Sequence, residues 1–499
     1  MRPIERLQAT LEGELKGYNL IVVSDMEPYI HSHDWDGIKC RSSAGGLSVA
    51  LDPIMRLCHG TWIAYGSGNA DAEAVDANDK VLVPPTNHQY TLRRIWLSKE
   101  EVDGYHTGFS NQSMWPLCHY AFVRPDFDPK NWECYKQINA RFARAAIEEE
   151  KEQEQRSVLW SHDYQLALLP KMIKDEIDIP VVHFWHIPWP TSDLFAMCPW
   201  KREILEGLLG SDLIGFHTKR YCMHFLHTVG RYLGARIDET GMTASYDGHT
   251  TLVRAHPISV DYEELHCTST CRSVSKEIHR WKRRYPQSYI SVGVGRIDYT
   301  KGLIEKVKAI DWFLEKYPEY QGNFVHIEAG VLDRLRVKAY TELDDVVDEM
   351  VDQINWKYHS GRWDPIVYVK EKLELPKLLA LYNIANLCIV SSTHDGLNIV
   401  SKEFIASRRN SSGVLLLSKF TGACQELREA VGFNPYDRDG FADAIKKGLE
   451  MPPEEATKRM RALRRRVKKN DIYEWVYRIV SDVVEMLQTT HGDQTDRSK

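Results

Sequence analysis

The chain has 499 residues, a formal net charge of −6 and 43% hydrophobic residues, so its length predicts two or three domains with substantial cores. The acidic balance argues against a nucleic-acid-binding protein, and the ten cysteines form no CxxC pair, which is typical of reduced thiols in the cytoplasm. No apolar run reaches about 18 residues and no signal peptide is evident, so we expect a cytoplasmic protein without a membrane partner.

The N-terminal segment predicts a buried strand, a loop and a helix. The strand covers residues 19–23, and a polar loop is expected over residues 27–41. Gly45 and Gly46 then precede a helical run, a geometry in which backbone N–H groups cradle phosphates. A plain tight turn between strand and helix explains the two glycines equally well.

Two further strands of the first half end at polar residues. Asp163 follows a strand at residues 157–160, and His186 follows a strand at residues 180–185. Strands alternating with helices predict a doubly wound parallel sheet, in which ligands bind beyond the carboxyl ends of the strands. A single histidine at such a place is more often structural, but two polar residues at successive strand ends favour a site.

The second half starts a new alternation of strands and helices, after a polar connection between domains expected over residues 264–275. Its first strand, residues 289–295, runs into a loop that carries Arg296 and Lys301. A guanidinium fork and an ammonium group on one such loop suit a diphosphate, although two solvated surface cations explain the loop equally well.

A later strand, residues 387–390, leads into a turn containing Asp395 and Gly396, and a helix is expected to start near Asn398. A glycine that lets the backbone approach a ligand, next to a helix N-terminus, forms a site for anions. Glu403 lies in that helix, where a carboxylate could hold the two hydroxyls of a ribose. Such units occur in every α/β protein, so this one alone does not identify a function.

The chain is therefore expected to form two α/β halves with a ligand cleft between them. The first domain is predicted over residues 1–262, with a C-terminal helix at about 472–490 packing back on it, and the second over residues 276–471. A basic run at residues 461–469 is most simply a solvated helix face. An acidic run at residues 342–345 is interpreted as surface, so no metal site is predicted.

Several motifs in this order resemble the trehalose-6-phosphate synthase family of retaining glycosyltransferases. The resemblance covers nearly the whole chain and implies the GT-B fold, in which two Rossmann-like domains face a central cleft. The most specific motifs are Gly45-Gly46-Leu47, Met114-Trp115-Pro116-Leu117, His162-Asp163-Tyr164, His186-Ile187-Pro188, Asp212-Leu213-Ile214-Gly215-Phe216-His217, Arg296-Ile297-Asp298-Tyr299-Thr300-Lys301-Gly302, Asp395-Gly396-Leu397-Asn398 and Gly413-Val414-Leu415-Leu416-Leu417-Ser418.

The resemblance implies glucose transfer from a nucleoside diphosphate glucose (UDP or GDP) to a phosphorylated acceptor, foremost glucose 6-phosphate, giving trehalose 6-phosphate. It implies no metal or other cofactor, because two cations would neutralise the leaving diphosphate. The implied catalytic residues are Arg296, Lys301, Asp163 and His186. The implied donor-binding residues are Gly45, Gly46, Arg296, Lys301, Asp395, Gly396, Leu397, Asn398, Ile399 and Glu403.

The implied acceptor-binding residues are Trp115, Arg334, Asp163, His106 and Arg41. Met26 stands where the family usually has an arginine that holds the acceptor phosphate, and His106 stands where it has a tyrosine. Losing an arginine–phosphate contact costs roughly 2–3 kcal/mol. The expected loop at residues 27–41 offers substitutes, namely His31, His33, Lys39 and Arg41.

These departures leave other functions open. A glucosylglycerol-phosphate synthase is one, because that related group also carries the sequence Glu27-Pro28-Tyr29. A pseudo-glycosyltransferase that joins cyclitols is another, and a non-catalytic sensor of sugar phosphates is a third, motivated by Met26, His106 and His394. The donor base, the acceptor and the formation of a homo-oligomer are not determined by the sequence.

Overall fold

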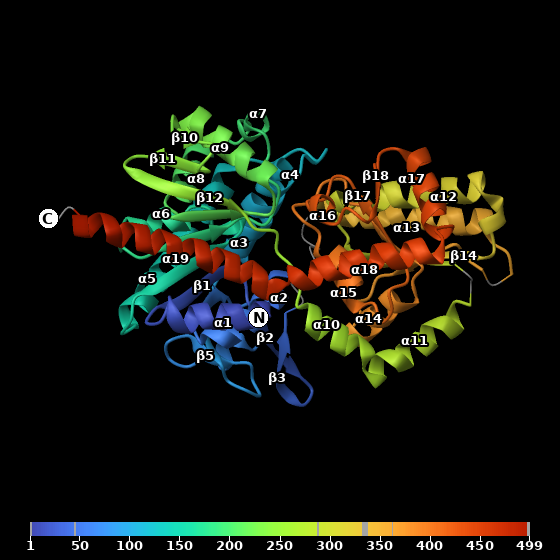
Figure 1. Ribbon diagram of the computed structural model, residues 1–499, viewed down its shortest axis with the longest axis horizontal. Coiled ribbons are helices and arrows are strands. Elements are labelled where there is room, and N and C mark those ends of the chain that lie inside the picture. The colour runs from blue at the N-terminus through green and yellow to red at the C-terminus, as the bar shows by residue number, and fades with distance from the viewer. Residues whose placement is uncertain (1, 44–45, 287–288, 332–337, 362, 497–499) are drawn as a thin grey trace. The chain divides into compact units, whose positions relative to one another are not determined.

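The computed structural model describes residues 2–43, 46–286, 289–331, 338–361 and 363–496, and the chain folds into two units (Figure 1). Unit 1 comprises Met1–Pro257 and Tyr473–Lys499, and unit 2 comprises Ile258–Ile472. In the described part of the chain, no helix is long and apolar enough to cross a membrane.

Unit 1 is built on a ten-stranded sheet in the order β10-β11-β12-β9-β8-β7-β1-β4-β6-β5. The seven strands from β12 to β6 are mutually parallel, and the pairs β10–β11, β11–β12 and β5–β6 are antiparallel. The chain proceeds in opposite directions from β1 and from β7, so the topological switch point lies between these two strands. The strands are β1 (Asn19–Met26), β4 (Thr61–Tyr65), β5 (Lys80–Val83), β6 (Tyr90–Ile95), β7 (Ser157–His162), β8 (Val181–Phe184), β9 (Leu213–Phe216), β10 (Arg236–Asp238), β11 (Thr243–Tyr246) and β12 (His249–Ala255).

The central strands β4, β7, β8 and β9 are buried along their whole length, as expected for parallel strands covered on both faces. The described helices of unit 1 are α1 (Pro3–Gly13), α2 (Gly46–Cys58), α3 (Lys99–Val102), α4 (Trp115–Cys118), α5 (Pro129–Glu152), α6 (Leu169–Lys174), α7 (Ser192–Phe195), α8 (Lys201–Leu209), α9 (Lys219–Leu233), α19 (Ile472–Asp496), the 3-10 turns η1 (Asp71–Glu73) and η3 (Tyr164–Leu166), and the π-helix η2 (Asp103–Met114).

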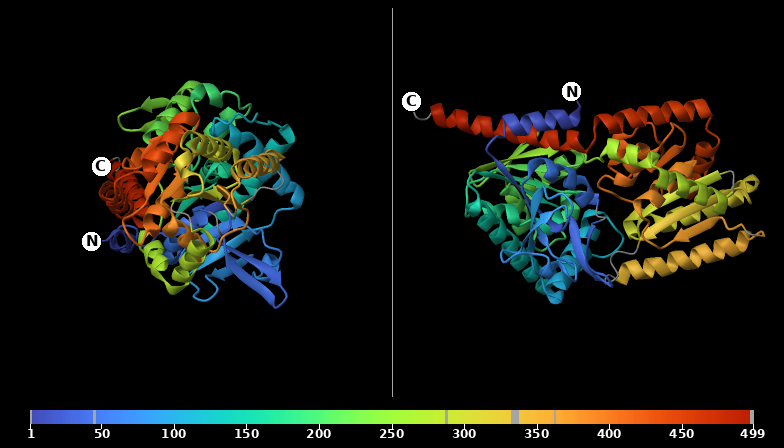
Figure 2. Two further views of the ribbon diagram at one scale, coloured as in Figure 1. Left: turned by 90° about the vertical axis from the view of Figure 1, so that its right-hand side faces the viewer. Right: turned by 90° about the horizontal axis from the view of Figure 1, so that it is seen from below.

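The C-terminal helix α19 packs on unit 1, far in sequence from the elements it touches. It runs beside α1, with the Arg6 guanidinium 4.9 Å from the centre of the Tyr477 ring (Figure 2). The Trp475 ring lies 5.3 Å from the Trp160 ring of β7, and its indole N–H donates to the carbonyl of His256. These contacts place the Trp475 ring of α19 against β7, the strand that precedes Asp163.

The loop expected over residues 27–41 is instead a β-hairpin formed by β2 (Tyr29–Asp34) and β3 (Gly37–Ser42). Its alternation is hidden in the sequence because a polar residue, His31, occupies a buried position that an apolar residue usually fills. The hairpin turn needs Gly37, whose φ of +117° strains any residue with a side chain.

Unit 2 is built on a six-stranded parallel sheet in the order β15-β14-β13-β16-β17-β18, with its switch point between β13 and β16. The strands are β13 (Tyr289–Arg296), β14 (Phe324–Val331), β15 (Ile366–Val369), β16 (Leu387–Val390), β17 (Val414–Ser418) and β18 (Val431–Phe433). The described helices are α10 (Tyr262–Thr270), α11 (Arg272–Arg284), α12 (Leu303–Lys316), α13 (Lys338–Tyr358), α14 (Leu375–Ile384), α15 (Ile399–Ser407), α16 (Ala423–Glu426), α17 (Arg438–Leu449), α18 (Pro453–Lys469) and the 3-10 turns η4 (Tyr299–Lys301) and η5 (Pro318–Tyr320).

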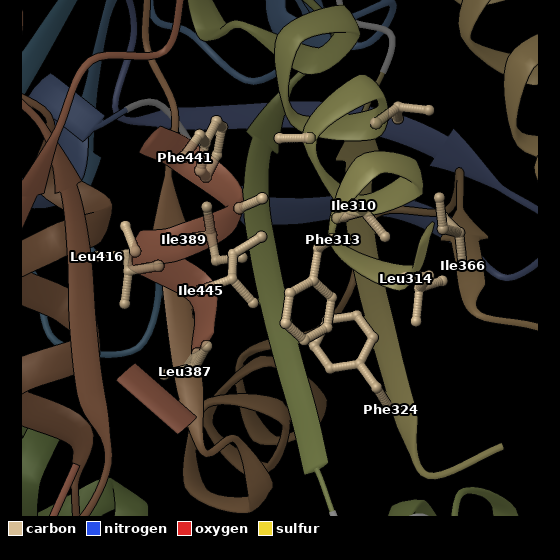
Figure 3. Packing of buried hydrophobic residues seen from close by; sticks show 14 of the residues in the cluster. Ile310, Phe313, Leu314, Phe324, Ile366, Leu387, Ile389, Leu416, Phe441 and Ile445 are labelled. Atoms are coloured by element: carbon tan, nitrogen blue, oxygen red, sulfur yellow. The ribbon is translucent and has the colours of Figure 1, made fainter. Parts of the chain in front are cut away.

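One face of this sheet carries the main core of unit 2 (Figure 3). Phe313 of α12 packs on Phe324 of β14 with ring centres 5.1 Å apart. Phe441 and Ile445 of α17 pack in the same cluster as Ile389 of β16. The core therefore fixes α12 against the strands from which the two candidate donor loops emerge.

The polar stretch at residues 264–275, expected to connect the domains, instead belongs to helices α10 and α11 of unit 2. The Asp261 side chain caps α10 by accepting a hydrogen bond from the backbone N–H of Glu264. The composition is polar because α11 buries only Val274 and Trp281. The units divide at Pro257 rather than at the predicted residue 262.

Candidate active site

The two loops beyond the switch point of unit 2 are bonded to each other. The backbone N–H of Thr393 donates to the carbonyl of Thr300, and the Ser391 hydroxyl donates to the carbonyl of Lys301. Gly302 begins α12 with a φ of +63°, and a Cβ on it would lie 2.1 Å from the carbonyl oxygen of Ser391. Only glycine fits there, and its small size lets the loop after β13 close against the loop after β16.

These loops bring Lys301 and Asp395 together. The Lys301 ammonium lies 2.7 Å from Asp395 Oδ2, and the Ser392 hydroxyl and the Asn398 amide donate to the same oxygen. Asp395 is 8% exposed, so its carboxylate is held in one orientation by three donors. Sequence reasoning named Lys301, Asp395 and Asn398 but missed Ser392.

Helix α15 supplies an anion-binding end to this site. Asn398 adopts a φ of +84° and caps the helix by accepting a hydrogen bond from the backbone N–H of Ser401. Other N–H groups of the first turn, beginning with Ile399, have no acceptor within the helix and suit a phosphate. Leu397 is buried and its carbonyl accepts from the backbone of Ala423, which fixes the turn that contains Gly396.

Two further donor-site candidates lie on the same elements: Arg296 is the last residue of β13, and Glu403 lies in α15. The Arg296 side chain is 34% exposed and its guanidinium lies 3.8 Å from Asp298, a buried residue that caps η4. Glu403 is half-buried, and burial raises the pKa of its carboxyl although the hydrogen bond from Tyr382 opposes this shift. The Tyr382 partner, which carries no sequence signal, orients the carboxylate proposed for the ribose.

In unit 1, Asp163 and His186 meet beyond the ends of β7 and β8. Asp163 has a φ of +70°, a strained conformation for a non-glycine residue, and its carboxylate accepts a hydrogen bond from the backbone N–H of His186. His186 Nε2 lies 3.1 Å from His162 Nδ1. Burial, reinforced by neighbouring imidazoles, lowers the pKa of His186, so this ring is neutral at pH 7 and can serve as a hydrogen-bonding group.

His106 and Asp25 form a pair at the end of β1, beside the switch point of unit 1. His106 Nδ1 lies 2.7 Å from Asp25 Oδ2, and Asp25 is 4% exposed. Met26 is 37% exposed, with the Tyr65 hydroxyl 3.7 Å from its sulfur. Trp115 begins α4 with its ring 4.0 Å from the His119 ring. The positions at which the resemblance implies an arginine and a tyrosine thus hold a thioether and a histidine paired with a carboxylate.

The hairpin cations expected to replace the missing arginine are engaged with carboxylates or buried. His33 bonds to Glu73 at 2.8 Å, and Lys39 bonds to Asp34 at 2.8 Å. Arg41 is 70% exposed and lies 3.8 Å from the same Asp34 carboxylate. Burial and the charge of Arg94 lower the pKa of His31, which is therefore neutral. Because Lys39 and Arg41 share the one carboxylate of Asp34, part of the positive charge of this pair stays uncompensated, on the exposed Arg41.

A buried ion cluster that sequence reasoning missed secures this hairpin. Arg94 of β6 bonds to Glu27 and to Asp71, both at 2.8 Å, and all three side chains are fully buried. Burial raises the pKa of Glu27 to about 7, and its hydrogen bond with Asp71 acts in the same direction. The pKa of Asp71 is lowered, because the hydrogen bonds it accepts outweigh its burial. Of the two carboxyl groups in the cluster, Glu27 is therefore the one that takes up a proton first as the pH falls.

Gly45, Gly46 and Arg334 are the remaining candidate site residues. Gly46 begins α2 and is exposed, whereas Gly45 and Arg334 lie outside the described residues. Among the residues that the structure describes, no three His, Cys, Asp or Glu side chains gather to hold a metal ion. The expectation that the reaction needs no cofactor stays a prediction.

Two Rossmann-like α/β units with polar residues at both switch points define the GT-B class of glycosyltransferases. The chain matches the model of glycosyltransferase family 20 over residues 18–485. It therefore belongs to this family, the trehalose-6-phosphate synthases.

Relatives of known name agree with this assignment. A bifunctional trehalose-6-phosphate synthase/phosphatase of Thermoproteus tenax is 34% identical, over 93% of this chain and 63% of that protein. An alpha,alpha-trehalose-phosphate synthase (UDP-forming) of Botryotinia fuckeliana is 33% identical, over 96% of this chain and 91% of the relative.

Solved structures are similar over most of the chain. A trehalose-6-phosphate enzyme of E. coli bound with UDP-2-fluoro glucose has a TM-score of 0.83 and 27% identity, covering 93% of this chain and 99% of that one. A UDP-forming synthase of Burkholderia xenovorans in complex with glucose-6-phosphate has the same TM-score, identity and coverage.

Proposed function

We propose that this glycosyltransferase transfers glucose from UDP-glucose to glucose 6-phosphate, giving trehalose 6-phosphate and UDP with retention of the anomeric configuration. The single observation that carries the proposal is the bonded pair of loops in unit 2, which holds Lys301 against Asp395 beside the N-terminus of α15. Similarity to the E. coli structure with UDP-2-fluoro glucose supports this donor, and similarity to the Burkholderia structure with glucose-6-phosphate supports this acceptor.

In the proposed reaction, the bond between C1 of glucose and the diphosphate oxygen breaks while the acceptor hydroxyl attacks C1 from the same face. Negative charge builds on the departing diphosphate, and Arg296, Lys301 and the N–H groups of α15 stabilise it. The proton of the acceptor hydroxyl passes to an oxygen of the leaving diphosphate. Donor binding would draw the Lys301 ammonium to phosphate and leave Asp395 to accept sugar hydroxyls.

Unit 1 would contribute Asp163 and His186 to substrate binding. His186 is neutral, and its Nε2 is within hydrogen-bond distance of His162 Nδ1. It would therefore bind a sugar hydroxyl rather than an anion. Asp163 is held by the backbone of His186, so the two side chains would act as one rigid acceptor-facing pair. Both roles are supported by their position at the carboxyl ends of β7 and β8.

The pair formed by His106 and Asp25 favours a second candidate, glucosyl transfer to another phosphorylated acceptor such as a polyol phosphate. The carboxylate of Asp25 stands next to Met26 and opposes the approach of an anion, so this end of β1 holds phosphate less strongly than an arginine would. The free thiols of all ten cysteines support the proposed cytoplasmic location.

The decisive experiment incubates the protein with UDP-, GDP- or ADP-glucose and a panel of phosphorylated acceptors. We expect release of UDP, and a product whose mass and anomeric proton coupling match trehalose 6-phosphate. A different product mass would select the second candidate. Binding of UDP-glucose by calorimetry without turnover on any acceptor would overturn both and indicate a sensor protein.

A further inference from the structure

A basic hollow of about 860 Å³ lies on unit 2 along helix α18, and none of the residues that line it belongs to the donor loops. Five cations and a single carboxylate, Glu454, are among the residues that line it. The whole chain carries a net charge of −6, so this concentration of positive charge is local. Its lining residues that matter below are Tyr262, Lys458, Arg461, Arg464, Arg465 and Lys468.

The cations follow the spacing of one helix face. Arg464, Arg465 and Lys468 follow Arg461 by three, four and seven residues, and another face of α18 buries Ala456, Met460, Leu463 and Val467. Like charges at this spacing repel one another and destabilise a helix. A simple solvated face, expected from the sequence, gives no reason for the hollow that they line.

Some cations of α18 are paired with carboxylates, whereas others are not. Arg459 pairs with Glu455 at 2.7 Å, and Arg466 pairs with Glu429 at 2.9 Å. In the described part of the chain, Lys458, Arg461 and Arg465 make no ion pair, and all three are exposed. Three of the five cations that line the hollow are therefore uncompensated.

Arg464 is positioned by neutral partners. Its guanidinium donates to the hydroxyl of buried Tyr262 at 3.0 Å and to His266 Nδ1 at 3.3 Å. Burial, together with the charge of Arg464, lowers the pKa of His266, so neither partner offsets the charge of the guanidinium. Lys468 lies 5.5 Å from the centre of the Tyr262 ring and pairs with Glu263.

The geometry also indicates the size of the ligand. Arg461, Arg464 and Arg465 lie within about one turn and suit one phosphate, whereas Lys458 and Lys468 are about 15 Å apart along the helix and suit further phosphates. The volume is within the range of small-molecule sites. Glu454 and Glu263 stand at either end of the cationic stripe, which disfavours a long polyanion.

We propose that the hollow along α18 binds a small, freely diffusing molecule that carries two or more phosphate groups. The site is independent of the proposed transferase activity, because its cations lie on α18 rather than on the loops after β13 and β16. α18 packs against α15, so the ligand would bind one helix away from Glu403.

The test uses inorganic tripolyphosphate as the probe, measured by calorimetry on the full chain in the presence of saturating UDP. We expect binding at one site and roughly 100-fold weaker binding in the Arg461→Glu/Arg465→Glu variant, because two charge-assisted contacts are lost. The control is Lys282→Glu/Arg283→Glu on α11, which makes the same charge change on exposed residues and should keep the wild-type affinity.

UDP binding is measured on each variant as a check of folding, and Arg461→Gln/Arg465→Gln replaces the glutamate variant should that protein not fold. Equal loss in the control, or no tripolyphosphate binding to the wild type, would overturn the proposal. Single-stranded RNA or phosphatidylglycerol vesicles are tested in parallel. If either binds through Arg461 and Arg465 and tripolyphosphate does not displace it, the surface serves a macromolecule or membrane and the proposal is wrong.

Discussion

The carboxyl end of the sheet in unit 2 differs from that in unit 1 in how its charges are arranged. In unit 2, the ammonium of Lys301 is bonded to Asp395 on a framework of backbone hydrogen bonds, beside a helix N-terminus that attracts anions. In unit 1, the strand β1 ends at Asp25 and Met26, and the hairpin cations Lys39 and Arg41 lie against one carboxylate. Under the proposed function, the end in unit 2 binds the donor diphosphate, and the end in unit 1 binds the acceptor phosphate with fewer cationic groups.

The difference shows that a donor site and an acceptor site place unequal demands on a protein. A leaving diphosphate needs cations that stabilise charge as it develops, so changes there are costly to the reaction. An acceptor can be held by many combinations of hydroxyl and phosphate contacts, so this end of unit 1 can change while the reaction class stays the same. The four predictions below test this contrast.

The largest effect is expected from Arg296→Ala and from Lys301→Ala. Each should lower kcat by about 100- to 1,000-fold while the fold is kept, because leaving-group stabilisation is lost. Steady-state UDP release measures this, and circular dichroism checks the fold. Lys308→Ala, an exposed residue of the same α12, serves as the control with an unchanged rate. Rates near the wild type in both variants would remove the assigned roles.

Arg94→Met tests whether the buried cluster holds the hairpin of unit 1. Two buried carboxylates, Glu27 and Asp71, would lose their cation, so the free energy of unfolding should fall by about 3–5 kcal/mol. Arg41→Met removes an exposed arginine 3.8 Å from its carboxylate and should cost less than about 1 kcal/mol. Denaturant titration compares the two. Similar small losses in both would show that the cluster contributes little.

The pH dependence of stability should report on Glu27. Its folded-state pKa of about 7 lies above the ordinary value of 4.5, so between these values the folded protein binds a proton that the unfolded chain has released. The free energy of unfolding should therefore fall as pH rises through this window, by at most about 1.4 kcal/mol per unit, and level off above it.

Glu27→Gln should remove that component of the slope. Denaturant titrations at several pH values within the window measure it for both proteins. An identical slope in the variant would mean that another group carries the titration.

The smallest effect is expected from Met26→Arg, which restores the family's acceptor-phosphate arginine. The KM for glucose 6-phosphate should fall by roughly tenfold, because a charge-assisted contact contributes about 1.5–3 kcal/mol and Asp25 offsets part of it. The KM for UDP-glucose should not change, and Met26→Leu is the control. An unchanged acceptor KM in Met26→Arg would show that the acceptor is bound by different groups.

Local signals in the sequence were sufficient for much of unit 2. The strand–turn–helix order around Asp395 and Asn398, and the cation pair Arg296 and Lys301, sit within a few residues of a predicted strand end, where the fold itself dictates the position. The helices at 264–275 were missed because a polar amphipathic helix with few buried residues resembles a linker in composition.

Unit 1 held more surprises because its partners are distant in sequence. The hairpin β2–β3 was missed because its buried face carries the polar residue His31. That side chain is hydrogen-bonded to Arg94, which lies on a later strand. His106 reaches Asp25 across 81 residues, and His33 of the hairpin reaches Glu73 across 40.

By itself, the sequence determined the fold class and the membership in glycosyltransferase family 20. These follow from hydrophobic periodicity and from motifs in which the functional residues are neighbours along the chain. Only the tertiary structure decided which cations are compensated. Arg466 of α18 pairs with Glu429, whereas Arg461 of the same helix makes no ion pair in the described part of the chain. The physical reason is that charge compensation acts through space at a few ångströms, and sequence separation carries no information about it.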